Sequence, residues 1–559
     1  MNAQSNSSGK FKTSLRELFP AFAIALALCY MLFVYEPMML YATHQNDFWF
    51  DFTLMARPML PGFLIFLGIS FFVLAAAYFA LGLFCGKKKT AAFGIVQIVV
   101  FGIMLVTFFQ GNILSMNLPP LDGVDIEWKS LWINDALTLA VMLGICGLLV
   151  FFVIKFGINR TLKYAKIFSL GFCVFLTLIA VIEMICMDGF KRKDSIITTD
   201  KNFSTVSRDK NFVIFLCDAI GSVEFKGVLE DNPQYKEVFE DFTYYPDTLS
   251  GYPCTRDNIP LILGGQFNKN EKPFNDFSSE TLNNSPLFKE LDKNGYDINL
   301  YEPELIWYGS RSFDIKNGSD FKRYKLPLKS FLAEELKYVR FKYLPYLLKQ
   351  YSRVESMDFN GLVDKFIWDD HTVYKNITDA PELEKTDRKM FSFVHCEGGH
   401  VPFKYDKDLN IIENGTYGQK IEATITMLNA YIERLKSNGA YDDTAIIILA
   451  DHGNAAINSA EGMLERGNPM LLIKGFDERH SFTESEKPVS FADLTDIYCN
   501  LLNGSSSEEA LSFINDSRER YYLWYRHFQF EYHMEEYLVT DKAWEWEKFT
   551  KTGKVYDLH

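Results

Sequence analysis

Five long apolar runs near the N-terminus constrain the fold of this chain more than any other feature. They cover residues 19–41, 60–84, 91–114, 136–156 and 167–186, and each approaches the ~20 apolar residues that a helix needs to cross a bilayer. The first run is too long for a cleavable signal peptide, lacks a small-residue cleavage site and is followed by four more such runs. The sequence therefore predicts an all-α transmembrane bundle over residues 1–188.

Basic residues in the short loops predict the orientation of this bundle, because Lys and Arg tend to remain in the cytoplasm. They lie before the first run, after the second and around the loop after the fourth: Lys10, Lys12, Arg16, Lys87 to Lys89, Lys155, Arg160, Lys163 and Lys166. With five crossings, we expect everything after about residue 188 to lie outside the cytoplasm. Lys191, Arg192 and Lys193 oppose this pattern, and they are either a solvated linker or a contact with anionic lipid headgroups.

Charge and cysteine content narrow the possible functions. The net charge of −14 gives no support to nucleic-acid binding, which needs a concentrated basic surface. Four of the nine cysteines lie outside the apolar runs: Cys217, Cys254, Cys396 and Cys499. An even number permits disulfides in an oxidising compartment, but the chain has no dense cysteine framework, so the sequence assigns no bridge and leaves the pairing of these cysteines open.

After a polar linker at residues 189–210, the sequence pattern changes to short strands alternating with helices. Candidate strands lie at 211–218, 296–302, 391–397, 444–451 and 469–475, and a helical pattern covers 418–439. This alternation predicts an α/β domain over residues 211–520 with a mainly parallel central sheet, whose functional groups gather at the carboxyl ends of the strands. The aromatic, strand-like extension at 521–559 adds either an edge to that sheet or a small subdomain.

Polar residues follow three of these strands. Asp218 ends the first, His395 and His400 follow the third, and Asp451 and His452 end the fourth. A mainly carboxylate set with one imidazole and one hydroxyl suits Mn²⁺ or Zn²⁺.

The segment LSGYPCTRDNIPLILGG at 249–265 supplies a candidate hydroxyl, Thr255, at the start of a helix-like stretch. A metal ion beside this hydroxyl would lower its pKa, and the N-terminus of a helix would favour the phosphate that it attacks. Thr255 is otherwise an ordinary residue capping the helix.

The ordered motifs FLCDAIG, GYPCTRDNIPLILGG, HCEGGHVPF and LADHGN resemble the alkaline phosphatase and sulfatase superfamily. The resemblance is strongest to its membrane-anchored phosphotransferases, the lipoteichoic acid synthases and the lipid A phosphoethanolamine transferases. It implies a sulfatase-like catalytic domain on the extracytoplasmic side of a bacterial cell membrane, held by a multi-pass anchor.

The resemblance also implies that Asp218, Thr255, Asp451 and His452 hold one divalent metal ion, with Mn²⁺ preferred and Zn²⁺ the alternative. Thr255 is then also the nucleophile, since it lies ten residues before Gly265, as the nucleophile does in the sulfatase motif. Its neighbour Cys254 is a rival, because conversion to formylglycine would make the protein a sulfatase. The sulfatase pattern Cys-x-Pro-x-Arg is missing, however.

Four further side chains are candidates for substrate binding. His400 resembles the histidine that contacts the substrate phosphate or protonates the leaving alkoxide, and His395 either binds substrate or satisfies a buried backbone group. Arg466 contacts a phosphate or caps a strand entry, and Arg311 lies in the region 303–390, where we expect the acceptor to bind. The segment after His452 contains no histidine, which argues against a second metal ion.

The resulting expectation is transfer of phosphoglycerol from phosphatidylglycerol to an envelope glycan or glycolipid, through a phosphothreonine ester. The single-metal set and the loop at 112–128, which resembles loops of envelope-decorating enzymes, favour phosphoglycerol. Phosphatidylethanolamine as donor, a sulfatase or phosphodiesterase that passes the group to water, and a non-catalytic lipid-binding relative remain alternatives. The sequence predicts no oligomeric state.

Overall fold

The computed structural model describes residues 17–45, 48, 50–117, 128–191, 196–302, 305–308, 311–320, 325–352, 354, 356–362, 369–454, 462–515, 517–525 and 533–557. The chain forms two compact units, one of Met1–Ser195 with Phe321–Asp364 and one of Ile196–Asp320 with Lys365–His559. The basic residues before residue 17, Arg192, Lys193 and most of the loop at 112–128 lie outside the described residues.

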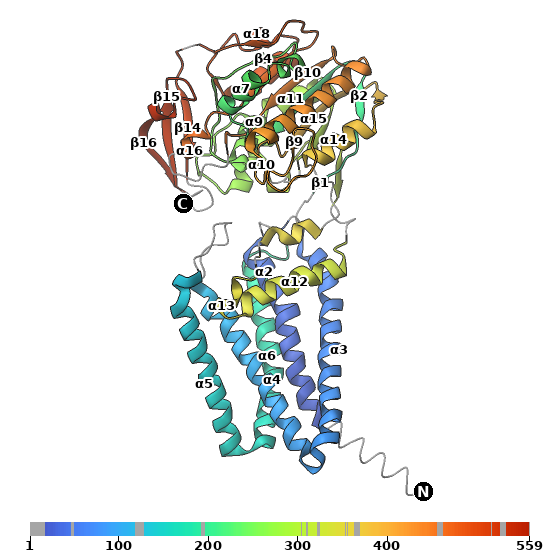
Figure 1. The fold of residues 1–559 in the computed structure, drawn as a ribbon, viewed down its shortest axis with the longest axis vertical. Coiled ribbons are helices and arrows are strands. Elements are labelled where there is room, and N and C mark those ends of the chain that lie inside the picture. The colour runs from blue at the N-terminus through green and yellow to red at the C-terminus, as the bar shows by residue number, and fades with distance from the viewer. Residues whose placement is uncertain are drawn as a thin grey trace. The chain divides into compact units, whose positions relative to one another are not determined.

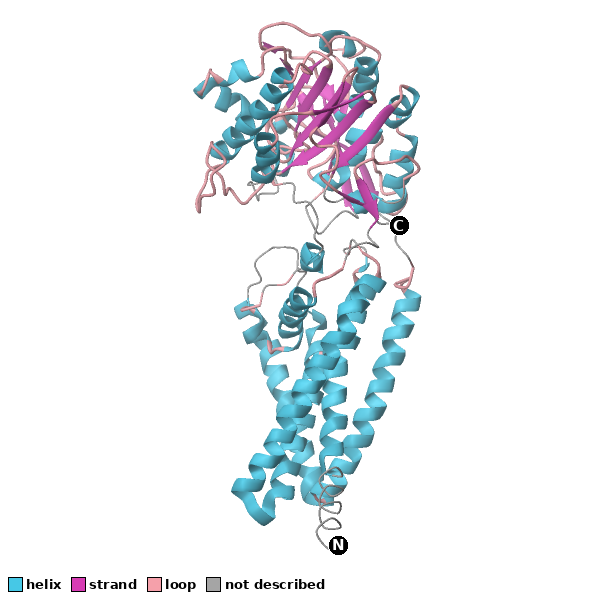
Figure 2. Cartoon of the chain, turned by 90° about the vertical axis from the view of Figure 1, so that its right-hand side faces the viewer, coloured by secondary structure: helices cyan, strands magenta, loops and turns pink. Residues whose placement is uncertain are grey.

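A seven-stranded sheet organises the second unit (Figures 1 and 2). Its strand order is β12 (Thr483–Glu484), β4 (Thr243–Tyr244), β11 (Leu471–Lys474), β10 (Thr444–Leu449), β3 (Asn211–Cys217), β9 (Lys389–Cys396) and β6 (Tyr296–Tyr301). The last four strands are parallel to one another, whereas β11 runs antiparallel to β10 and β4. All five predicted strands are present, and the predicted fold class is confirmed.

Helices cover both faces of this sheet, as Figure 2 shows. One core layer joins alternate strand residues to α9 (Thr255–Gly264), α11 (Pro286–Lys293) and α17 (Leu494–Leu502). The opposite layer joins the intervening residues to α7 (Ser222–Asp231), α14 (Asp370–Asp379) and α15 (Tyr417–Ser437). A capping box of Thr416 and Gln419 begins α15, close to the predicted helix at 418–439.

Two boundaries differ from those predicted. Part of the predicted linker belongs to the second unit, because β1 (Ile196–Thr198) pairs with β7 (Gly318–Asp320) and β2 (Thr205–Ser207) pairs with β8 (Glu384–Thr386). These strands are too short to give a periodic signal in the sequence. The C-terminal extension forms its own antiparallel sheet of β14 (Arg520–Trp524), β15 (His533–Val539) and β16 (Thr550–Asp557), which is the small subdomain of the two expected arrangements.

The first unit contains the apolar helices. Four helical stretches of the described residues are long and apolar enough to cross a membrane: Glu17–Thr43, Phe52–Asn112, Trp128–Phe156 and Ile158–Cys186. The second stretch consists of α3 (Phe52–Cys85) and α4 (Lys89–Asn112), which reverse direction at the 3-10 turn Gly86–Lys88 (Figure 1). The five apolar runs of the sequence fall on these four stretches, which confirms the helical N-terminal part.

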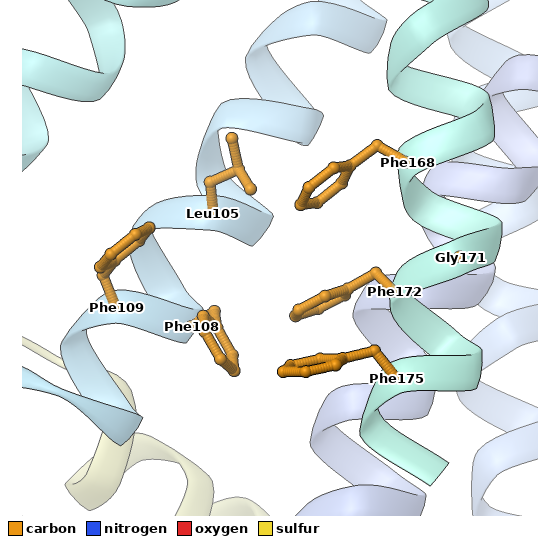
Figure 3. A pocket seen from close by; sticks show the side chains of 7 residues that line it. All are labelled: Leu105, Phe108, Phe109, Phe168, Gly171, Phe172 and Phe175. Atoms are coloured by element: carbon orange, nitrogen blue, oxygen red, sulfur yellow. The ribbon is translucent and has the colours of Figure 1, made fainter. Parts of the chain in front are cut away.

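An apolar groove of about 400 Å³ lies between α4 and α6 (Ile158–Cys186), and Figure 3 shows aromatic rings from both helices facing each other across it. Its lining consists of Leu105, Phe108, Phe109, Phe168, Gly171, Phe172 and Phe175. None of these side chains carries a hydrogen-bonding group. Such a surface suits contact with hydrocarbon, because a polar group exposed there would lose its hydrogen bonds to water.

The segment Phe321–Asp364, which we predicted within the catalytic domain, instead belongs to the unit of apolar helices. Its helix α12 (Leu328–Tyr343) packs on α3 and α4. Lys342 and Tyr343 both donate hydrogen bonds to Glu36, which is fully buried in the first helical stretch. Glu335 is also fully buried, and burial together with the charge of Glu36 raises its pKa well above the usual range.

Replacing Gly111 by Leu should loosen this packing, because a Cβ atom at Gly111 would lie 2.2 Å from the ring of Tyr343. We expect destabilisation of about 1–3 kcal/mol, as in overpacked cores, seen as a lower Tm of the full chain in detergent and faster proteolysis within residues 321–364. Gly147→Leu is the matched control, because no atom lies within 4 Å of its Cβ position. Equal Tm values and cleavage rates for the two variants would contradict this account of α12.

Candidate metal centre and active site

Four adjacent parallel strands bring the polar residues of the site together. Asp451 follows β10, Asp218 follows β3, His395 lies near the end of β9, and Glu302 follows β6. The register places Leu449 beside Leu216, Leu216 beside His395, and Tyr301 beside Val394. The carboxyl ends of all four strands therefore meet at one edge of the sheet, as expected for a parallel α/β domain.

Alternation along the strands directs these side chains to a single face. The residue two positions before each of them belongs to the same core layer: Leu449, Leu216, Phe393 and Leu300. Because successive strand residues point to opposite faces, Asp451, Asp218, His395 and Glu302 point to the face that α9 covers. This is how Thr255, at the start of α9, meets the strand ends.

Thr255 is the first residue of α9, and Cys254 caps the helix in an extended conformation. Asn258 holds the preceding loop in place: its side-chain oxygen accepts from the amides of Gly251 and Tyr252 at 3.1 Å, and its amide donates to the Tyr252 and Cys254 carbonyls. The Thr255 hydroxyl lies close enough to the Asp451 carboxylate to lower its pKa. The sequence identified Thr255, whereas the role of Asn258 emerges only from the structure.

Asp218, Asp451 and His452 form a site that fits a divalent cation. Donor atoms of these three residues lie within 4.8 Å of one another, and this is the one such group of three or more among the described residues. His452 Nε2 lies 3.7 Å from Asp218 Oδ1 and 3.5 Å from Asp451 Oδ2. Both of these carboxylate oxygens are buried without a hydrogen-bond partner, so bound metal would satisfy two groups that are otherwise costly to bury.

The electrostatics of the two carboxylates also favour a bound cation. Burial and the charge of Asp218 raise the pKa of Asp451. Burial alone would also raise the pKa of Asp218, but the histidines around it, His395, His400 and His452, hold that pKa below its usual range. Two carboxylates sharing a site repel each other, and a divalent cation between them offsets that repulsion.

A glycine pair brings His400 to this site. Gly398 has a φ of +53°, and a Cβ atom there would lie 2.5 Å from the backbone of Cys217. The amide of Gly399 donates to the Asp218 carbonyl at 2.7 Å, so the loop lies directly against the end of β3. His400 follows as an exposed side chain whose charge acts on Asp218.

Buried ionic contacts also hold the loop that contains Gly398 and Gly399. Lys420 of α15 is fully buried, and its Nζ lies 2.9 Å from Glu397 and 3.6 Å from Asp370. Asp370 also accepts from the amide of Gly398 at 3.3 Å. Truncating one member of such a buried set leaves an uncompensated charge, so this set contributes to the position of the Gly398 and Gly399 pair.

Arg466 and Arg311 have different surroundings. Arg466 is 7% exposed and donates to the carbonyl of Pro253 at 3.1 Å, which places it under the loop that carries Thr255. Arg311 donates to the carbonyl of Leu305 at 2.7 Å, and burial lowers its pKa to about 10. No contact in the described part of the chain joins Arg311 to Asp218, Asp451 or Thr255, so its substrate role remains a prediction.

Cys254 has the chemistry of a buried thiol. Its side chain packs against the core layer of α9, and burial, followed by the charge of Asp257, raises its pKa to about 12. All nine cysteines are free in the structure.

Binding of Mn²⁺ should depend on Asp451. We expect the full-length protein in detergent to bind Mn²⁺ in isothermal titration calorimetry, and Asp451→Asn to weaken binding at least about 100-fold, because even residues that only support a ligand contribute 10- to 100-fold. Asp496→Asn, at an exposed position of α17, should leave the affinity unchanged. A wild-type affinity in the Asp451 variant would disprove this metal site.

Cys254 should resist alkylation in the native protein. With a pKa of about 12, only about one thiol in 10⁴ is the reactive thiolate at pH 8, and raising the pH should increase the rate. Peptide mass spectrometry after iodoacetamide treatment measures this directly, with the protein denatured in SDS as control. Equal labelling of Cys254 in native and denatured protein would show that the thiol is accessible and ionised.

The sulfatase family model matches residues 210–497, just over half of the chain, and no curated protein matches in sequence. Similar solved structures include an alkaline phosphatase superfamily protein from Vibrio parahaemolyticus, at 12% identity and TM-score 0.38, with 65% of this chain and 85% of that chain covered. A 2-O GAG sulfatase matches at 12% identity and TM-score 0.37, covering 60% and 81%.

The lipoteichoic acid synthase LtaP from Listeria monocytogenes is also similar, at 14% identity and TM-score 0.34, with 66% of this chain and 91% of that chain covered. The family match spans β3, α9, β9 and β10, and so contains every residue of the candidate metal centre. The chain belongs to the sulfatase family.

Proposed function

We propose that this protein transfers a phosphoglycerol headgroup from a membrane phospholipid to an envelope glycan or lipid-linked acceptor. The observation that carries the proposal is the Thr255 hydroxyl, which lies at the N-terminus of α9 close to Asp451, a member of the group formed with Asp218 and His452. A hydroxyl at a helix N-terminus is well placed to attack a phosphate, because the helix amides and dipole favour its negative charge.

In the first step, Thr255 Oγ bonds to the phosphorus of the donor, and the bond from phosphorus to the diacylglycerol oxygen breaks. The electron pair leaves with that oxygen, which takes a proton from His400, while the hydroxyl proton of Thr255 passes to water. In the second step, the acceptor hydroxyl bonds to phosphorus and gives its proton to His400. The Thr255 ester bond breaks, and Thr255 Oγ takes a proton back from water.

A divalent cation held by Asp218, Asp451 and His452, with Mn²⁺ preferred over Zn²⁺, would lower the pKa of the Thr255 hydroxyl and offset charge on the phosphoryl oxygens. Other residues of the chain hold the reacting groups in position. Asn258 and Arg466 hold the loop before Thr255, and the Gly398 and Gly399 pair fixes the backbone beside His400.

The apolar helices support a lipid donor over a soluble one. A lipid donor stays in the bilayer, and a catalytic unit on the same chain as membrane-spanning helices meets it at high effective concentration. We therefore infer an extracytoplasmic catalytic unit at a bacterial cell membrane, the side indicated by the basic loops.

Sulfate ester hydrolysis through a formylglycine is less well supported. Cys254, the residue that would be converted, is partly buried against the core layer of α9, and the Cys-x-Pro-x-Arg pattern of the sulfatases is missing around it. Phosphoethanolamine transfer is the second candidate, because the metal centre and Thr255 would serve either headgroup.

The test is release of diacylglycerol from vesicles of phosphatidylglycerol or phosphatidylethanolamine by the full-length protein with Mn²⁺. We expect release from phosphatidylglycerol, and a loss of about 10³-fold or more in Thr255→Ala, as when a nucleophile is removed. Thr378→Ala, at an exposed position of α14, is the matched control and should retain full activity. Activity of the Thr255 variant equal to wild type would disprove the proposal. Release of diacylglycerol from phosphatidylethanolamine alone would instead identify phosphoethanolamine as the transferred headgroup.

A further inference from the structure

Glu302 lies beside the metal centre, and none of the sequence motifs includes it. Its Oε2 lies 2.8 Å from Nδ1 of His395, and Nε2 of the same ring lies 3.9 Å from Asp218 Oδ2. Glu302 is 2% exposed and His395 is 9% exposed. The imidazole of His395 therefore lies between a carboxylate that belongs to the metal centre and one that does not.

The backbone around Glu302 is fixed independently of this contact. Asn317 brackets the end of β6, since its side chain accepts from the Leu300 amide at 2.9 Å and donates to the Leu300 carbonyl at 3.0 Å. The hydroxyl of Thr198 donates to the carbonyl of Glu302 at 3.3 Å. The carboxylate is thus presented from a rigid strand end, as expected of a group that orients another side chain.

The contact determines what the histidine can offer to the site. A carboxylate only accepts hydrogen bonds, so Nδ1 must carry the proton that it donates to Glu302. The opposite nitrogen, Nε2, is then the ring atom directed toward Asp218. The partner of one ring nitrogen fixes the orientation and the tautomer of a functional histidine in this way. Nδ1 of His400 instead lies 2.6 Å from the carbonyl oxygen of Val401.

We propose that Glu302 is a positioning residue that holds His395 with Nε2 directed to the substrate beside Asp218, where Nε2 accepts a hydrogen bond from a hydroxyl of the transferred group. This inference rests on the proposed phosphotransfer. It gives His395 a defined role in that reaction, and this role differs from that of His400. His395 is a buried, oriented contact, while His400 is the exposed group that exchanges protons.

Glu302→Gln tests the proposal, because Gln has nearly the same shape as Glu but can turn its amide nitrogen toward Nδ1. A role in packing alone would leave this variant active. A positioning role predicts a 10- to 100-fold loss of kcat, as for other groups that support functional histidines, with Tm and Mn²⁺ affinity unchanged. The matched control is Asp557→Asn, since Asp557 makes the same 2.8 Å contact with His533 at an exposed position of the C-terminal sheet.

A double-mutant cycle completes the test. If Glu302 acts through His395, then Glu302→Gln should change kcat less than twofold in a His395→Ala background. Equal losses in the two backgrounds, wild-type kcat in Glu302→Gln, or a lower Mn²⁺ affinity in that variant would each overturn the proposal. Failure of the proposed function gives a different result, namely wild-type activity in Thr255→Ala.

Discussion

The burial of two carboxylates next to each other is the constraint on which the rest of the catalytic unit depends. Asp218 and Asp451 follow neighbouring parallel strands, and each has a buried oxygen with no hydrogen-bond partner. Such an arrangement is costly unless a cation compensates it. The surrounding histidines, the Thr255 hydroxyl and the packed glycine loop are all consistent with a site that binds a metal and presents one nucleophile to an anionic substrate.

The sheet explains how residues distant in sequence converge. Four parallel strands in register bring their carboxyl ends to one edge, and alternation sends the four polar side chains to the face covered by α9. The positions of the groups therefore follow mainly from backbone hydrogen bonding in the sheet. Local contacts, such as those of the Asn258 side chain and of Gly398 with β3, then set the final geometry of the site.

Most of this arrangement could be predicted from the sequence. The strand-ending Asp218 and Asp451 and the hydroxyl of Thr255 stand out, because apolar strands and a helix start are local patterns. Glu302 could not be recognised from the sequence, because a single carboxylate at the end of a strand is common. Its proposed role depends on its contact with His395, which lies 93 residues away in the sequence. The signal that was available is the polar residue that ends the second predicted strand, at the same edge of the sheet as the others.

Sequence patterns also did not predict the unit to which residues 321–364 belong. These residues have no long apolar run, yet they belong to the unit of apolar helices, where Glu36 accepts hydrogen bonds from Lys342 and Tyr343. The chain thus passes between the two units three times. Docking of this kind depends on pairs far apart in sequence, such as Gly111 and Tyr343, which hydrophobic periodicity does not reveal.

The central claim is that Asp218, Asp451, His452 and Thr255 together hold one divalent metal ion. Anomalous diffraction at the manganese edge, from crystals of the full-length protein grown with Mn²⁺, tests it most directly. The account predicts one strong peak in contact with Asp218 Oδ1, Asp451 Oδ2, His452 Nε2 and the Thr255 hydroxyl. A peak at other residues, or none at this position at saturating Mn²⁺, would contradict it.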